Sequence, residues 1–189
     1  FHLEERKVTG LIGGNGAGKT TFVNLLSRLY DPDTGIITLN NNDIKNYNYA
    51  SYRNIFGVVF QDYNYYAFTI AENIALDLYD NNNVDQKGIQ MVLCKAGLKK
   101  KISSLPNGIF TNLRKIFDAE GIEFSGGEAQ KLAIAKALYK NAEVFVLDEP
   151  SSALDPHSEN DLIQVFKHLS DEGHTVILIS HRLSVCKYA

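Results

Sequence analysis

Cysteine is scarce in this chain of 189 residues, and the two that occur, Cys94 and Cys186, are far apart in sequence. They form no CxxC pair and no metal-ligand spacing, a usage typical of a reducing compartment. Long apolar runs are also missing. Runs such as 56–60 and 175–179 are far shorter than the roughly 18–20 residues that span a bilayer, and no secretory signal is visible. We therefore expect a soluble, cytosolic chain, which can still have a membrane partner.

An excess of positive charge is lacking too. The formal net charge is -3 and the isoelectric point is near 6.0, so no nucleic-acid partner is expected. Hydrophobic residues make up 44% and charged residues 22% of the chain, ordinary values for a globular protein. The length fits one domain with a small subdomain. Both ends lie close to expected core elements, so we expect a piece of a larger protein.

Short apolar segments alternate with amphipathic ones at both ends of the chain. Expected strands cover 8–13, 36–40, 55–60, 144–148 and 174–180, expected helices cover 19–29, 69–78, 84–97, 99–106, 128–140 and 157–173, and 41–44 and 46–50 are expected loops. This alternation predicts an α/β fold with a mostly parallel sheet flanked by helices. We expect residues 1–62 and 136–189 to form the core and 63–135 to form an inserted α-helical subdomain.

A glycine-rich loop at 13–20 matches the pattern G-x-x-x-x-G-K-[ST] between an expected strand and an expected helix. Its backbone N–H groups can converge on phosphate oxygens, and the helix that follows adds positive potential at its N-terminus. Lys19 is expected to reach the β- and γ-phosphates of ATP, and the Thr20 hydroxyl to bind Mg²⁺. The predicted cradle comprises Gly13, Gly14, Asn15, Gly16, Ala17, Gly18, Lys19, Thr20 and Thr21. The loop predicts a P-loop NTPase.

Two carboxylates follow the apolar stretch 144–147. The carboxyl end of a buried parallel strand is where ligands lie in such sheets. Asp148 is the expected partner of Mg²⁺, through water, and Glu149 is placed to orient or deprotonate the attacking water. Alone, the pair is also typical of a solvated strand end; together with the phosphate loop it predicts ATP hydrolysis.

The stretch Phe124–Gln130, FSGGEAQ, precedes an expected helix. Ser125 and Glu128, three residues apart, fit a capping box that only starts that helix. The two adjacent glycines at a helix N-terminus also suit backbone contact with an anion. The residues of this stretch alone leave both interpretations open.

The order of the motifs decides between them. The phosphate loop, Gln61 after a strand, SGGE before a helix, LDEP at 147–150, SALD at 152–155 and a strand-end histidine in ISHR follow one another along the chain. In this order and spacing the chain resembles the nucleotide-binding domain of ATP-binding cassette (ABC) proteins over essentially its whole length. The resemblance implies that two copies, or this domain and a paralogue, pair head to tail around two ATP molecules.

The resemblance also assigns roles. Ser125, Gly126 and Gly127, with Glu128 after them, would face the γ-phosphate of the ATP held by the partner's phosphate loop. Gln61 would link the Mg²⁺ site and the attacking water to the helical subdomain, Asp155 would lie at the dimer seam, and His181 would contact the γ-phosphate.

The segment 69–76 resembles the version found in exporters, in which a transmembrane domain contacts this region. The implied protein is an ATPase that powers transport from the cytoplasmic face of a membrane.

Three features depart from the family pattern. The commonest signature has Leu before the serine and Gln after the glycines, where this chain has Phe124 and Glu128. A carboxylate near a γ-phosphate is unfavourable, so we expect Glu128 to turn back onto Ser125 as its capping partner. The family's adenine-stacking aromatic lies upstream of the phosphate loop and its C-terminal continuation lies beyond His181, and neither is expected in this chain.

Other functions of ABC proteins fit this sequence less well. A DNA-repair or chromosome-structure ATPase would carry a long coiled coil between Gln61 and the signature, and here the intervening segment is short and without heptads. A translation-type protein has two such domains and usually a basic linker, which the acidic isoelectric point does not favour. A non-hydrolysing regulatory domain is disfavoured by the presence of Lys19, Asp148 and Glu149.

Overall fold

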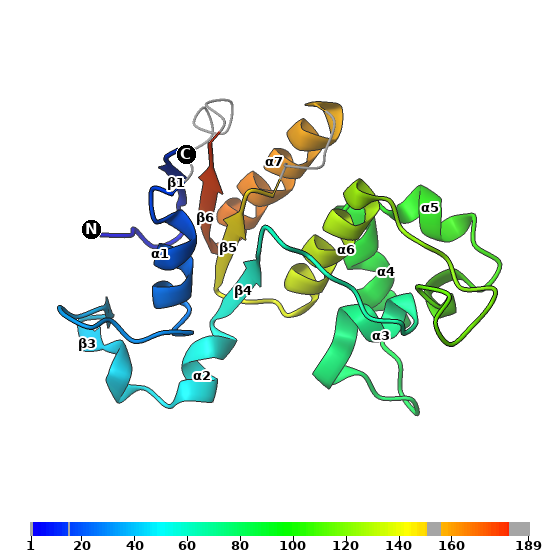
Figure 1. The fold of residues 1–189 in the computed structure, drawn as a ribbon, viewed down its shortest axis with the longest axis horizontal. Coiled ribbons are helices and arrows are strands. Elements are labelled where there is room, and N and C mark those ends of the chain that lie inside the picture. Colours follow the sequence, from blue (N-terminus) through cyan, green and yellow to red (C-terminus); the bar gives the residue numbers. More distant parts are fainter. Residues whose placement is uncertain (1, 15, 151–155, 182–189) are drawn as a thin grey trace. The chain divides into compact units, whose positions relative to one another are not determined.

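The computed structural model of the protein describes residues 2–14, 16–150 and 156–181 (Figure 1). The chain divides into two compact units. The first, here called the sheet unit, comprises Phe1–Gln61, Ala142–Pro150 and Phe166–Ala189, and the second, the helical unit, comprises Asp62–Asn141 and Ser151–Val165.

A four-stranded sheet forms the centre of the sheet unit, with every neighbouring pair of strands parallel (Figure 1). The strand order is β1 (Val8–Ile12), β6 (Thr175–Ser180), β5 (Val144–Asp148) and β4 (Phe56–Val59). Strands β5 and β6 are almost entirely buried, as their unbroken apolar runs require. Because the strands are parallel, all their carboxyl ends lie at one edge of the sheet.

The register shows which residues meet at that edge. Ile12 pairs with Ser180, and Asp148 pairs with Ile179. The loop after β1, the residue after β5 and the residue after β6 are therefore neighbours. Helix α1 (Lys19–Leu26) begins directly after the loop that follows β1 and packs against β5. The core of this unit consists of Val23, Ile44, Tyr52, Phe56, Val146, Ile177 and Ile179.

Two expectations for residues 36–50 are wrong. The expected strand at 36–40 pairs only over β2 (Thr38–Leu39), which forms an antiparallel hairpin with β3 (Asn42–Asp43) inside the expected loop. The turn residues Asn40 and Asn41 have φ angles of 51° and 64°, the left-handed pair that a tight hairpin turn requires and that asparagine tolerates.

The expected loop at 46–50 instead leads into a helix. A short 3₁₀ helix (Ile44–Asn46) is followed by α2 (Tyr49–Asn54), and the Asn48 side chain caps α2 by accepting the N–H of Ser51. Buried Tyr52 fixes α2 to the core of the sheet unit. The asparagine–tyrosine composition hid the helix because its stability comes from the cap and from packing.

The helical unit is built around α6, which packs against α3 and α4. Its helices are α3 (Ile70–Ala75), α4 (Gln86–Lys95), α5 (Lys99–Ser103) and α6 (Gly126–Tyr139), with 3₁₀ turns at Leu76–Leu78 and Gly108–Phe110. Thr69 and Glu72 form a capping box that starts α3. The expected helices lie where α3 to α6 are found, although each differs by a few residues at its ends.

Helix α7 (Pro156–Asp171) contributes its residues up to Val165 to the helical unit and its residues from Phe166 to the sheet unit. Within the described ranges, no helix has the length and apolar character that crossing a lipid bilayer demands.

Candidate functional site: a phosphate loop and an SGGE helix start

The glycine loop after β1 has the backbone that its sequence predicts. Gly16 and Gly18 have φ angles of 76° and 87°, a left-handed region that glycine enters without the steric cost of a side chain. Gly18 is the N-cap of α1, so Lys19 is the first residue of that helix. Gly13, Gly14 and Ala17 lie in this turn, Thr20 and Thr21 are exposed on the first turn of α1, and Asn15 lies outside the described residues.

The Lys19 side chain folds back over the glycine loop that precedes α1. Its ammonium donates to the carbonyl oxygens of Gly13 and Gly14, at 2.8 and 3.1 Å. It is also 3.8 Å from Glu149 Oε1. A cation held at the mouth of a helix N-terminus provides strong positive potential for an anion.

Thr20 and Asp148 bring oxygen ligands together at the carboxyl edge of the sheet. The Thr20 hydroxyl donates to Asp148 Oδ2 at 3.1 Å. Burial raises the pKa of Asp148, the hydrogen bond from Thr20 opposes this, and the charge of Glu149 adds to it. A hydroxyl and a carboxylate are hard oxygen donors of the kind that Mg²⁺ takes, one or two at a time, alongside waters and substrate phosphates. These two residues fit a magnesium ion.

The Glu149 side chain is buried, and its carboxylate contacts two basic side chains. Besides Lys19, His181 Nδ1 lies 2.7 Å from Glu149 Oε2. Because a carboxylate only accepts hydrogen bonds, Nδ1 carries the proton in this contact. The Glu149 N–H donates to the carbonyl of Ile179 on β6. The residues that immediately follow β5 and β6 are thereby joined.

Gln61 follows β4 and is exposed at the same edge of the sheet. The hydrogen bonds and ion pairs just given do not include it. Asp155, predicted for the dimer seam, lies outside the described residues.

The SGGE segment starts α6 in the helical unit. The Ser125 side chain accepts the Glu128 N–H at 3.3 Å, and Glu128 Oε2 accepts the Ser125 N–H at 2.8 Å. Glu128 therefore turns back as the expected capping partner of Ser125. The helix begins at Gly126, two residues before the expected start, because the cap residue is Ser125. Ser125 and Gly126 are exposed.

Two side chains that lie around the SGGE segment, Tyr65 and Lys101, are not predicted by any sequence pattern. The Tyr65 hydroxyl donates to Glu123 Oε2 at 2.9 Å and accepts the N–H of Phe124 at 3.2 Å. Lys101 Nζ, on α5, lies 3.1 Å from Glu128 Oε1. Lys101 belongs to a run of three lysines, and the sequence pattern does not show which of them contacts Glu128.

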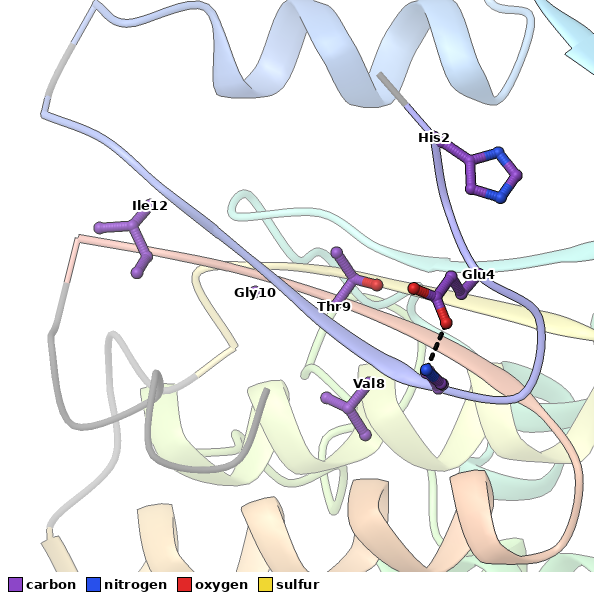
Figure 2. Close-up of a pocket in the computed structure, with 7 residues that line it drawn as sticks. His2, Glu4, Val8, Thr9, Gly10 and Ile12 are labelled. Atoms are coloured by element: carbon purple, nitrogen blue, oxygen red, sulfur yellow. Dashed lines mark ion pairs between the residues drawn. The ribbon is translucent and has the colours of Figure 1, made fainter.

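A separate hollow of about 420 Å³ lies along β1. It is lined by residues of β1 and of the segment before it, including His2, Val8 and Ile12, and an ion pair between Lys7 and Glu4 borders it (Figure 2). Neither Lys19 nor any of its partners lines this hollow, so the phosphate loop and this cavity are different places on the sheet unit.

A parallel sheet whose first strand leads through this loop into a helix, with a Thr–Asp pair beside it, defines the class of P-loop nucleotide-binding proteins. The particular family follows from comparison with known proteins. The sequence model of the family described as ABC transporter matches residues 1–152, and the chain belongs to that family.

Named relatives and a solved structure agree with this assignment. The ATP-dependent lipid A-core flippase of Coxiella burnetii is 36% identical over 189 residues, which are 100% of this chain and 31% of the flippase. The mitochondrial ATP-binding cassette sub-family B member 10 of Mus musculus is 38% identical over 182 residues, 96% of this chain and 25% of that protein. A structure of a bacterial Atm1-family ABC exporter with ATP bound matches with a TM-score of 0.85 and 33% identity, covering 95% of this chain and 30% of the exporter chain.

These matches confirm the predicted family and the predicted P-loop NTPase fold. The chain spans less than a third of the length of these relatives. Since the relatives are named as a flippase, a member of an ABC sub-family and an exporter, they do not favour the soluble DNA-repair or translation alternatives.

Proposed function

We propose that this chain binds and hydrolyses ATP as one half of a head-to-tail pair and thereby powers transport through a transmembrane domain. The observation that carries the proposal is the cluster at the carboxyl edge of the sheet, where Lys19, Thr20, Asp148, Glu149 and His181 lie in one set of contacts. The cluster combines a cation for phosphate, oxygen ligands for Mg²⁺ and a carboxylate for water.

Each residue of the cluster has a separate task. Lys19 exchanges the carbonyls of the loop for the β- and γ-phosphate oxygens. Thr20 would hold Mg²⁺ directly and Asp148 would hold it through water, and the bound ion would supply positive charge beside the phosphates. Glu149 orients the attacking water or accepts its proton. His181 fixes the Glu149 carboxylate and contacts the γ-phosphate.

The SGGE segment is proposed to act on the ATP of the partner. Ser125 and Gly126 are exposed at the start of a 14-residue helix, whose N-terminal N–H groups attract anions whichever chain holds them. Gln61, Asp155 and Gly127 complete the proposed two-chain site. ATP then favours the closed pair, and its hydrolysis removes that preference, which is how a binding difference between two states drives a conformational cycle.

The direction of transport is inferred from the relatives. Over the matched region a flippase is 36% identical and an exporter structure 33% identical to this chain. We infer that the parent protein is of the exporter type and that this chain lies at the cytoplasmic face of its membrane. The segment that starts α3, with the capping box of Thr69 and Glu72, is the proposed contact with the transmembrane domain.

The test uses Glu149→Gln, which should block hydrolysis and trap the closed pair. Sedimentation of this variant is followed with and without Mg-ATP, recording protein mass and bound nucleotide together. We expect the mass to double only with Mg-ATP and each pair to hold two nucleotides.

The matched control adds Ser125→Arg to the same background. Because Ser125 lies on the segment that faces the partner's ATP, the double variant should bind ATP as a monomer and fail to pair. Loss of ATP affinity in the dilute double variant would show that the SGGE segment serves its own chain. Pairing of the double variant would show that the segment does not act on the partner's ATP. A Glu149→Gln chain that binds no ATP would refute the function itself.

A further inference from the structure

Phe124, which precedes the SGGE segment, and Glu128, its last residue, both lie near the side chain of Lys101. Lys101 Nζ lies 3.1 Å from Glu128 Oε1 and 5.9 Å from the centroid of the Phe124 ring. The commonest family signature has Gln and Leu where this chain has Glu128 and Phe124. A carboxylate and an aromatic face both attract an ammonium group, so both departures favour a cation at this place.

Glu128 changes the charge at the start of α6. Burial alone would raise the pKa of Glu128, but the Ser125 N–H and the Lys101 ammonium hold it below its usual value, so the side chain is a full negative charge at neutral pH. A helix N-terminus carries roughly half a positive charge. Without a counter-ion, the carboxylate would leave the start of α6 net negative and repel a phosphate.

We propose that Lys101 is a positioning residue for the ATP-bound pair: it neutralises the charge of Glu128, so that the SGGE segment can face the partner's γ-phosphate. This inference rests on the proposed function, since it assumes that the segment meets the ATP of a second copy. Lys101 belongs to the helical unit and to none of the contacts of the Lys19 cluster, so it acts on pairing and not on the chain's own phosphate loop.

The local geometry indicates that Lys101 neutralises the charge of Glu128 and does not serve a purely structural role. The Ser125–Glu128 capping box uses Glu128 Oε2, and Lys101 binds the other oxygen, Oε1. The lysine is therefore not needed to form the cap, and a glutamine at 128 could cap equally well. What Lys101 adds is charge, and that contribution can be separated from the cap by changing both residues.

The experiment measures two quantities in the Glu149→Gln chain: the ATP affinity of the dilute monomer and the dissociation constant of the Mg-ATP-dependent pair. For Lys101→Met we expect unchanged ATP affinity in the monomer and a dissociation constant of the pair raised about tenfold. When Lys101→Met is combined with Glu128→Gln, we expect the dissociation constant of the pair to return to within about threefold of that of the parent, the Glu149→Gln chain without further changes. Glu128→Gln alone should pair more tightly than the parent, because it leaves the cation of Lys101 uncompensated. The effect should shrink as salt is raised, since a charge effect is screened.

Lys100→Met is the matched control, because it removes the same charge from the same helix. Lys100 is not the partner of Glu128 in the ion pair. It should pair as the parent does. Thermal unfolding of each variant tests whether it is folded.

The outcomes separate this inference from the proposed function. If the parent chain binds Mg-ATP and does not pair, both the head-to-tail proposal and this inference are overturned. If the parent pairs and Lys101→Met pairs equally well, only the inference is overturned. A weakened Lys101→Met that Glu128→Gln does not restore would show a structural role for Lys101 and also overturn neutralisation.

Discussion

Replacing Tyr52 with phenylalanine tests how the phosphate loop's helix is supported. Tyr52 is 1% exposed, and its hydroxyl donates to the carbonyl oxygen of Leu26, at the last residue of α1, over 2.7 Å. Its ring lies near those of Tyr47 and Phe56, with centroids 6.0 and 5.1 Å away. Tyr52→Phe keeps the ring and removes only the hydrogen bond between α2 and the helix that starts with Lys19.

The expected cost at neutral pH follows from that single bond. A buried hydrogen bond contributes about 0.5–1.5 kcal/mol, and more when its loss leaves a buried group unpaired. We therefore expect Tyr52→Phe to lower the free energy of unfolding by about 1–2 kcal/mol. For a chain of this size that corresponds to a melting temperature lower by about 2–8 °C, measured by circular dichroism.

The same hydroxyl makes a prediction at alkaline pH. Burial raises the pKa of Tyr52 to about 12 from 10.0, with Arg28 opposing the rise. The raised value belongs to the folded state, so the stabilisation is fully present below pH 10 and is lost as the pH rises toward 12. Two pKa units correspond to about 2.7 kcal/mol. Urea unfolding between pH 8 and 12 should show the parent losing its advantage over Tyr52→Phe across this window, and a constant difference would refute the reasoning.

Two predictions concern the cluster at the carboxyl edge of the sheet, to which Lys19 and His181 belong. Lys19→Ala removes the ammonium that lies 2.8 Å from the Gly13 carbonyl, and we expect ATP affinity, measured by calorimetry, to fall at least about 100-fold, since a charge-assisted contact to phosphate is lost; wild-type hydrolysis in this variant would contradict the phosphate-loop assignment. His181→Ala removes the imidazole 2.7 Å from Glu149 Oε2. It should leave ATP affinity within about threefold while turnover falls by about 10²–10³, and equal losses in both quantities would show that His181 only supports the fold.

The sequence predicted the strands of the sheet unit that end at the site better than it predicted the segments between them. The expected strand at 144–148 coincides with β5. A short continuous apolar run is typical of a strand buried on both faces of a parallel sheet, and the acidic residues at its end mark where the strand stops. The hairpin at Thr38–Asp43 and helix α2 were missed. The hairpin depends on two left-handed asparagines, and α2 depends on a side-chain cap and on the burial of Tyr52; single-residue preferences encode neither.

The residues of the candidate site also differ in how well the sequence predicts them. Local spacing was enough to predict the phosphate loop, because its chemistry uses consecutive backbone groups around Lys19. The contacts of Glu149 with Lys19 and His181 join residues from three places in the chain. The sequence predicted a role for each of these residues, for His181 only through the family resemblance, but it did not predict that they contact one another. Lys101 could not be found from sequence, since its partner Glu128 follows after a loop whose path is set by packing.

Glu149 has a φ angle of 52°, a left-handed conformation that costs a residue with a side chain roughly 1–2 kcal/mol and that glycine adopts freely. The position thus carries a carboxylate where the backbone alone would favour glycine or asparagine. A library of variants selected only for heat resistance is accordingly expected to lose this side chain early, and with it the carboxylate that is proposed to act on the attacking water. Thermal selection on this chain must therefore be coupled to an activity screen.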